Sequence, residues 1–250
     1  MNGGKIVRSG NPSLRENTFN DYQGLGYQNE MTISGTVNKT FILLVLVTAS
    51  AAFTWYLYFT GQNVMPYLIT GAIGSFIFAL ITIFAKKAAP VTAPIYAILE
   101  GLFIGGISAF YEEQVEGITF MAVSLTFAVL FGLLLVYKSG LIKVTQNFRL
   151  GIFAATLGIF LAYFLHFILS FFGMSIPFIH DSGPIGIGVS VFIVIIAALN
   201  LVLDFDFIEK GAEMRCPKYL EWYAAFGLMV TLVWLYLEIL RLLSKIFSRD

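Results

Sequence analysis

Three carboxylates lie inside long apolar segments of this chain, where an ionisable side chain needs a chemical reason. Glu100 lies in PIYAILEGLFIGGIS, Asp204 in LVLDFDFIEKG and Glu238 in VWLYLEILRLL. A charged residue near the middle of a membrane-spanning helix costs about 3 kcal/mol to insert, so such residues usually face a protein interior or a water-filled cavity. Asp206 is a weaker candidate, because openly polar residues follow it directly.

The chemistry open to two such acids is proton sharing and cation binding. Two carboxyl groups that meet in a medium of low dielectric constant cannot both ionise cheaply, so they share a proton. The protonated pair is a neutral, hydrogen-bonded latch, whereas the ionised pair repels itself and attracts cations. Calcium prefers carboxylate oxygens. Such a pair can therefore act as a pH switch and as a transient calcium site.

The neighbours of these acids leave two interpretations open. Asn200 precedes Asp204 by one helical turn, and Arg241 follows Glu238 by three residues, so each pair shares a helix face. In the simpler interpretation, Asp204 and Asp206 mark a helix end at the level of the lipid headgroups, and Glu238 forms a local ion pair with Arg241. In the functional interpretation, Asp204 and Glu238 face the bundle interior or a pore.

Glu100 and His166 are further polar candidates within apolar segments. No basic residue lies within one turn of Glu100, which must find a partner on another helix, be protonated or touch water. Gly101 and Gly105 form a G-x-x-x-G pattern that permits close helix approach. A neutral His166, hydrogen-bonded between helices, is favoured over a proton sensor.

The elements that must position these residues are membrane-spanning helices. Of the 250 residues, 58% are hydrophobic and only 12% are charged, whereas a soluble domain has about 25% charged residues. Residues 1–39 are predicted to be a polar, largely disordered arm, and residues 40–250 a single transmembrane domain. Seven segments approach the roughly 20 apolar residues that span a bilayer. They are Thr40–Thr60, Pro66–Ala85, Ala93–Tyr111, Ile118–Tyr137, Leu150–Phe172, Ile185–Ile208 and Tyr219–Leu243.

Basic residues alternate between successive connections and predict a cytoplasmic N-terminus. They occur before the first segment and after the second, fourth and sixth: Lys5, Arg8, Arg15, Lys39, Lys86, Lys87, Lys138, Lys143, Arg149, Lys210, Arg215 and Lys218. The C-terminal end conflicts with this rule, because seven spans place Arg241, Lys245 and Arg249 outside. Either the last segment is re-entrant or the rule is overridden there. Seven spans are favoured, because only the final element disagrees.

Three motifs resemble those of the Bax inhibitor-1 family. LDFDFIEKG resembles the motif of its sixth helix, LYLEILRLL that of its seventh, and IYAILEGLFIGGIS its acidic, glycine-rich third segment. The polar arm with SGNPSLRENTF looks like the bacterial, YccA-like branch. The resemblance covers residues 10–245. It implies an all-α bundle of seven transmembrane helices with the last helix at the centre. It also implies pH-sensitive calcium leak, suppression of cell death in eukaryotes and modulation of a membrane protease in bacteria.

The resemblance also implies a pH sensor made of two aspartates on the sixth and seventh helices. Asp204 takes the first position and Glu238 the second. Two departures change the pattern, because Leu203 stands where the family has Tyr and Glu238 where it has Asp. The longer Glu keeps the carboxylate but alters the geometry of the pair.

The depths of the two acids complicate this assignment. With helix ends near Ile208 and Tyr219, Glu238 would lie about 28 Å beyond the start of its helix, while Asp204 would stay near the cytoplasmic side. The acids can meet if Gly211–Tyr223 lies along the membrane surface and the seventh helix enters later. An extended sixth helix would also bring them closer.

The leading functional hypothesis is therefore a pH-gated cation leak, passing calcium, in a bacterial plasma membrane. The alternative is a non-conducting protein that binds a membrane-embedded protease through the polar arm, residues 1–39. A proton-coupled transporter ranks third, because no internal repeat is evident. An enzyme is not expected: serine-hydrolase and zinc-protease motifs are missing, and GIGVS follows the G-x-G-D spelling of intramembrane aspartyl proteases only as far as the second Gly. A neutral net charge argues against nucleic acid, and no cofactor is expected.

Overall fold

The computed structural model describes residues 30–173 and 183–248. Most of the predicted arm lies outside these residues. Its last part, from Ile33 onward, belongs to the first helix, which begins seven residues before the predicted span. Thr32 caps this helix by accepting a hydrogen bond from the backbone N–H of Gly35 at 2.9 Å.

Seven of the described helices are long and apolar enough to cross a bilayer, which confirms the predicted number of spans. A short 3-10 turn, η1 (Lys86–Ala88), joins the second of them to the third. The long helices are α2 (Ile33–Phe59), α3 (Met65–Phe84), α4 (Ala89–Gln114), α5 (Ile118–Lys138), α6 (Gln146–Ser170), α8 (Pro184–Glu213) and α9 (Leu220–Phe247).

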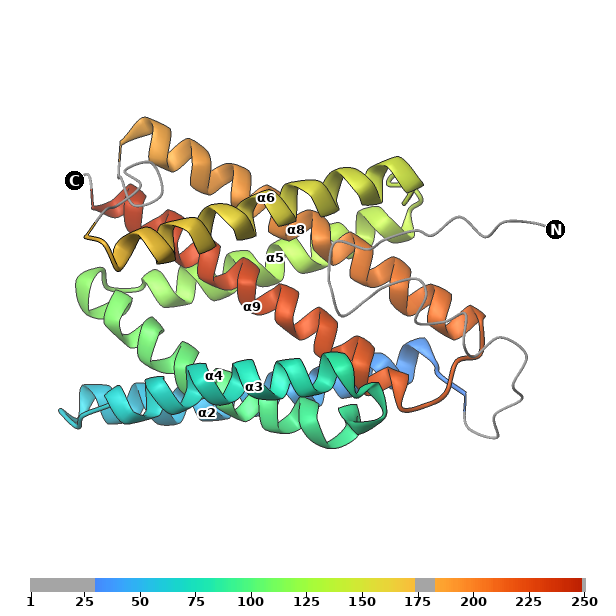
Figure 1. The fold of residues 1–250 in the computed structure, drawn as a ribbon, viewed down its shortest axis with the longest axis horizontal. Helices are drawn as coiled ribbons and strands as arrows, with labels where there is room; N and C mark the ends of the chain where they lie inside the picture. Colours follow the sequence, from blue (N-terminus) through green and yellow to red (C-terminus); the bar gives the residue numbers. More distant parts are fainter. Residues whose placement is uncertain (1–29, 174–182, 249–250) are drawn as a thin grey trace.

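The last helix is the most buried, as predicted. Of the most apolar window of α9, 67% is buried, against 11% for α6. Figure 1 shows α9 crossing the middle of the molecule, with α2, α3 and α4 on one side and α5, α6 and α8 on the other. Direct packing joins α9 to α2, α4, α5 and α8. The buried polar residues of α9, Glu221, Thr231, Glu238 and Lys245, are therefore held among protein groups rather than in lipid.

The connection between α8 and α9 differs from the expected surface segment. Helix α8 continues to Glu213 and α9 already begins at Leu220, so the expectation that Gly211–Tyr223 lies along the membrane surface was wrong. Instead, the sixth helix is extended, which was the other option considered above. Its polar last turns are held against other helices by the Tyr137–Glu209 hydrogen bond and the Arg149–Asp206 ion pair.

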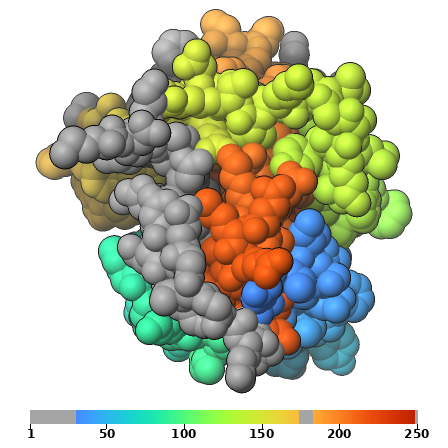
Figure 2. Space-filling model, turned by 90° about the vertical axis from the view of Figure 1, so that its right-hand side faces the viewer, coloured from blue at the N-terminus to red at the C-terminus, as the bar shows by residue number. Residues whose placement is uncertain are grey.

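The segment that enters α2 is paired with this connection. Glu30 forms an antiparallel bridge with Pro217, and the N–H of Met31 donates to the carbonyl oxygen of Cys216 at 2.6 Å. Figure 2 looks onto this end of the molecule, where the α8–α9 turn lies beside the start of α2. The start of the first span is therefore attached to the start of the last one.

Candidate functional site

Asp204 is completely buried in the interior of α8. Its exposed fraction is 0%, and it precedes the end of α8 by nine residues, or about 14 Å. Asp204 therefore faces the bundle interior, and it does not mark the end of its helix, because α8 continues to Glu213. One turn earlier, Asn200 donates to Thr156 Oγ1 on α6 at 2.9 Å and to the carbonyl oxygen of Ile196 at 2.8 Å. Asn200 thus fixes this level of α8 against α6.

Asp206 belongs to a separate cluster nearer the helix end. It forms ion pairs with Arg149 of α6, at 2.5 Å, and with Lys210, at 3.1 Å. Its side chain is 14% exposed. Asp206 therefore links α6 to α8 and differs in environment from Asp204, two residues away.

Glu238 is buried and fully engaged by neighbouring side chains. It is 2% exposed, and both its oxygens accept from the Tyr163 hydroxyl at 3.1 Å and from Arg241 Nη1 at 3.0 Å. Trp234 Nε1 donates to Oε1 at 3.3 Å. Arg241 also lies over the Tyr163 ring, 5.1 Å from its centroid. The local Glu238–Arg241 pair forms as its spacing indicated, and Tyr163 ties it to α6.

Asp204 and Glu238 lie at different depths of the bundle. Lys245 Nζ donates to the carbonyl oxygen of Gly186 at 3.1 Å and to Ser190 Oγ at 2.9 Å, which fixes the antiparallel register of α8 and α9. In this register Asp204 is level with Met229, nine residues before Glu238. The rise of a helix converts this to about 14 Å. The longer sixth helix thus reduces the expected separation between Asp204 and Glu238 but does not bring the two carboxylates together.

Glu100 lies about 17 Å from the start of α4, near mid-depth. It is 9% exposed and hydrogen-bonded to the Ser75 hydroxyl of α3. The glycines beside it permit close approach, because a Cβ at Gly101 would lie 2.0 Å from Ser50 Oγ, and one at Gly105 2.2 Å from the Ala51 carbonyl oxygen. Glu100 thus finds its partner on another helix, one of the options left open above.

His166 is half-buried on α6, one turn after Tyr163. Across residues 30–173 and 183–248, no group of three His, Cys, Asp or Glu side chains is placed to hold a metal ion.

The sequence interpretation missed Glu221, in the first turn of α9. Its exposed fraction is 0%. Its carboxylate binds Lys39 and accepts from the backbone N–H and the hydroxyl of Thr32, both at 3.0 Å. A Cβ at Gly35 would lie 2.1 Å from Glu221 Oε1, so Gly35 makes room for this contact. An acid at a helix start was the available signal, but its partners lie more than 180 residues away.

The basic residues near the C-terminus are accounted for within the bundle. Arg241 is bound by Glu238 and Tyr163, and Lys245 is 5% exposed and bound to α8. Arg249 lies outside the described residues. Since two of the three conflicting charges are neutralised or hydrogen-bonded inside the protein, they do not count as free loop charges. Helix α9 is continuous rather than re-entrant.

A family model described as Bax inhibitor 1 like matches residues 11–248, which is nearly the whole chain. No curated protein and no solved structure matches the chain significantly.

Proposed function

Because the chain belongs to the Bax inhibitor 1 like family, we propose that it is a pH-sensitive cation leak of a bacterial plasma membrane, with its N-terminus in the cytoplasm and calcium as the ion. The observation that carries the proposal is the complete burial of Asp204 within a membrane-spanning helix. An intramembrane acid is a functional residue by default. The family resemblance supplies the ion and the pH dependence.

The two carboxylates act in series in this proposal. Glu238 is occupied by Arg241 and Tyr163, and this cluster closes one half of the path where α6 meets α9. Asp204 controls the other half, closer to the α8–α9 turn. A calcium ion that reaches Glu238 must displace Arg241, since both bind the same oxygens. The pH dependence follows from charge: protonation removes the negative charge that attracts a cation, so the leak falls as pH falls.

The remaining buried polar residues have supporting roles. Glu100 lines the path or stays paired with Ser75, and Asn200 holds α8 against α6. Asp206 belongs to the ion-pair cluster with Arg149 and does not conduct. His166 contributes a hydrogen-bonding group. No step involves covalent catalysis, a cofactor or a resident metal ion.

Calcium flux into proteoliposomes at pH 6, 7 and 8 tests the proposal. Wild type is compared with Asp204→Asn, Glu238→Gln and the control Asp206→Asn. We expect wild-type flux to rise with pH, Asp204→Asn and Glu238→Gln to lose this dependence, and Asp206→Asn to keep it. No flux in any sample would reject the leak. Flux that keeps its pH dependence in both test variants would remove these two acids from the gate.

The second candidate is a non-conducting protein that modulates a membrane-embedded protease. It is favoured by the pairing of Glu30 and Met31 with the α8–α9 turn, because a partner that pulls on the preceding arm would act on the central helix directly. Deletion of residues 2–28 leaves this pairing intact. A regulator should lose its effect on protease activity after this deletion, whereas a leak should keep conducting.

A further inference from the structure

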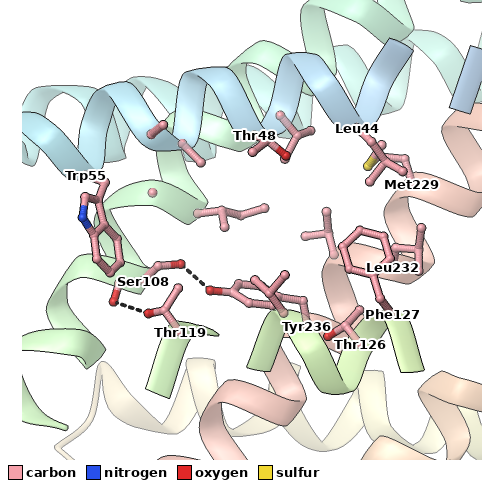
Figure 3. Close-up of a pocket in the computed structure, with 17 residues that line it drawn as sticks. Leu44, Thr48, Trp55, Ser108, Thr119, Thr126, Phe127, Met229, Leu232 and Tyr236 are labelled. Atoms are coloured by element: carbon pink, nitrogen blue, oxygen red, sulfur yellow. Dashed lines mark hydrogen bonds between the residues drawn. The ribbon is translucent and has the colours of Figure 1, made fainter. Parts of the chain in front are cut away.

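A cavity of about 420 Å³ lies beside the middle of α9, where Met229, Leu232, Val233 and Tyr236 line it. Its walls come from four helices. Figure 3 shows α2 on one side of it and α5 on the other, with side chains of α4 and α9 between them. Apart from a few hydroxyl groups, the lining side chains are apolar, including Leu44, Trp55, Phe127, Met229 and Leu232.

The mouth of the cavity faces the lipid. Thr48 and Ala52 of α2 and Val123 of α5 line the cavity and are exposed on the outer surface of the bundle. The back of the cavity is different, because Met229 and Leu232 of α9 are only 1% and 4% exposed. All of these residues belong to helices that span the membrane. What enters this cavity therefore comes from the hydrocarbon layer and reaches the central helix.

The dimensions of the cavity suit one hydrocarbon chain. Leu44 and Trp55 both line it and are eleven residues apart on α2, which corresponds to about 17 Å. One leaflet supplies about 15 Å of hydrocarbon, half of the bilayer core. An apolar cavity of about 150 Å³ holds a benzene molecule and stays free of water. The volume here is nearly three times larger, enough for roughly 16 to 18 carbon atoms on that scale.

One end of the cavity is polar. The hydroxyls of Ser108 and Tyr236 are 2.5 Å apart, and Thr119 Oγ1 donates to the carbonyl oxygen of Ser108 at 3.2 Å (Figure 3). Trp55 lies at the same end. Thr119 is the second residue of α5, so this end is near the membrane surface. Hydroxyl and indole groups at this depth suit the ester region of a lipid.

We propose that this cavity binds one acyl chain of a bilayer phospholipid from the leaflet nearest the α4–α5 turn. The ester linkage lies at Ser108, Thr119 and Tyr236, and the chain runs along α9 toward Met229. This site does not depend on the proposed leak. It makes the packing of the central helix dependent on the surrounding lipid.

A phospholipid with a photoactivatable diazirine in its acyl chain tests the site. In liposomes of this lipid, we expect light to label the four α9 residues that line the cavity, which bulk lipid does not reach because they are buried: Met229, Leu232, Val233 and Tyr236. Exposed Phe164 on α6 serves as the reference for labelling by bulk lipid.

Matched substitutions on α2 provide the control. Ala52→Phe and Thr48→Phe each fill the mouth of the cavity and should lower α9 labelling about tenfold or more relative to Phe164. Ala49→Phe adds the same side chain at an exposed position of α2 that does not line the cavity, and should leave α9 labelling unchanged. Two filling variants are used so that a folding defect in one does not decide the result. Labelling confined to exposed residues in wild type, or equal α9 labelling in all four proteins, overturns the proposal.

Discussion

Replacing Glu221 by Gln should open the contact between the start of α2 and the α8–α9 turn. The carboxylate binds Lys39 and the N–H and hydroxyl of Thr32, and it is inaccessible to solvent. Removing one partner of a buried charge pair costs about 3–5 kcal/mol. Since the Lys39 side chain is 16% exposed, we take the lower end, ~3 kcal/mol. Local opening then becomes about 100-fold more frequent, at 1.4 kcal/mol per factor of ten.

Cys216 gives a direct assay for this opening. It is the single cysteine of the chain, it is buried, and its carbonyl oxygen accepts from the N–H of Met31. A maleimide can reach its thiol only when this contact opens. We expect the labelling rate at neutral pH to rise about 100-fold in Glu221→Gln.

The control for this assay is Glu213→Gln. Glu213 carries the same charge near the same turn but is exposed, so its replacement should leave the labelling rate within about twofold of wild type. A rate for Glu221→Gln as close to wild type as that would refute the inference that Glu221 holds the two helix starts together.

Three further predictions address other parts of the molecule. Burial raises the pKa of the Cys216 thiol to about 11. A thiol with a raised pKa stabilises the closed form below its unfolded pKa of about 8.5, and this contribution is lost as pH rises toward 11. The rate of maleimide labelling of native protein should therefore keep rising about tenfold per pH unit between pH 9 and 10, where the rate for denatured protein levels off. Gly105→Ala should lower the free energy of unfolding by about 1–3 kcal/mol, because the new Cβ would meet the Ala51 carbonyl oxygen at 2.2 Å. Gly132→Ala on α5 should instead raise the free energy of unfolding by up to ~1 kcal/mol, because its new Cβ would have no atom within 4 Å. Thermal unfolding in detergent measures both changes. Lys245→Met should leave the two termini on opposite sides of the membrane, as C-terminal reporter fusions would detect, because the Lys245 charge is held inside the bundle; inversion in that variant would contradict the explanation of the basic C-terminal end.

The number of spans and their order could be predicted because the apolar runs are long and the breaks between them contain Pro, Gly and charge. The ends could not. Helix α2 extends back to Ile33 through polar residues that hydropathy excludes, because its start is fixed by Thr32 and by Glu221 from the other end of the chain. Helix α8 extends to Glu213 for a similar reason, since its polar last turns are held by residues of α5 and α6.

Part of the candidate site could likewise be predicted from the sequence, and part of it could not. The Glu238–Arg241 pair follows from a spacing of three residues on one helix, and the sequence suffices to find it. Its third member, Tyr163, lies 75 residues away on α6 and depends on how the helices pack. The acids that a motif places together, Asp204 and Glu238, are separated in the register of α8 and α9, which follows from the short connection between these helices and agrees with the contacts of Lys245 at their far ends.

The central position of α9 constrains how the protein is made. Helices enter the membrane in the order of synthesis, so α9 follows the six long helices that precede it in the chain. Until then, the faces of α2, α4, α5 and α8 that pack against α9 have no protein to contact. Arg241 pairs with Glu238 on α9 itself, but its contact with Tyr163 needs α6 and the contacts of Lys245 need α8, so the assembled molecule favours the insertion of α9. A chain cut short after α8 should therefore keep the packing of α2, α3 and α4 with one another but lack the helix that packs against α2, α4, α5 and α8, and become a substrate for membrane quality control.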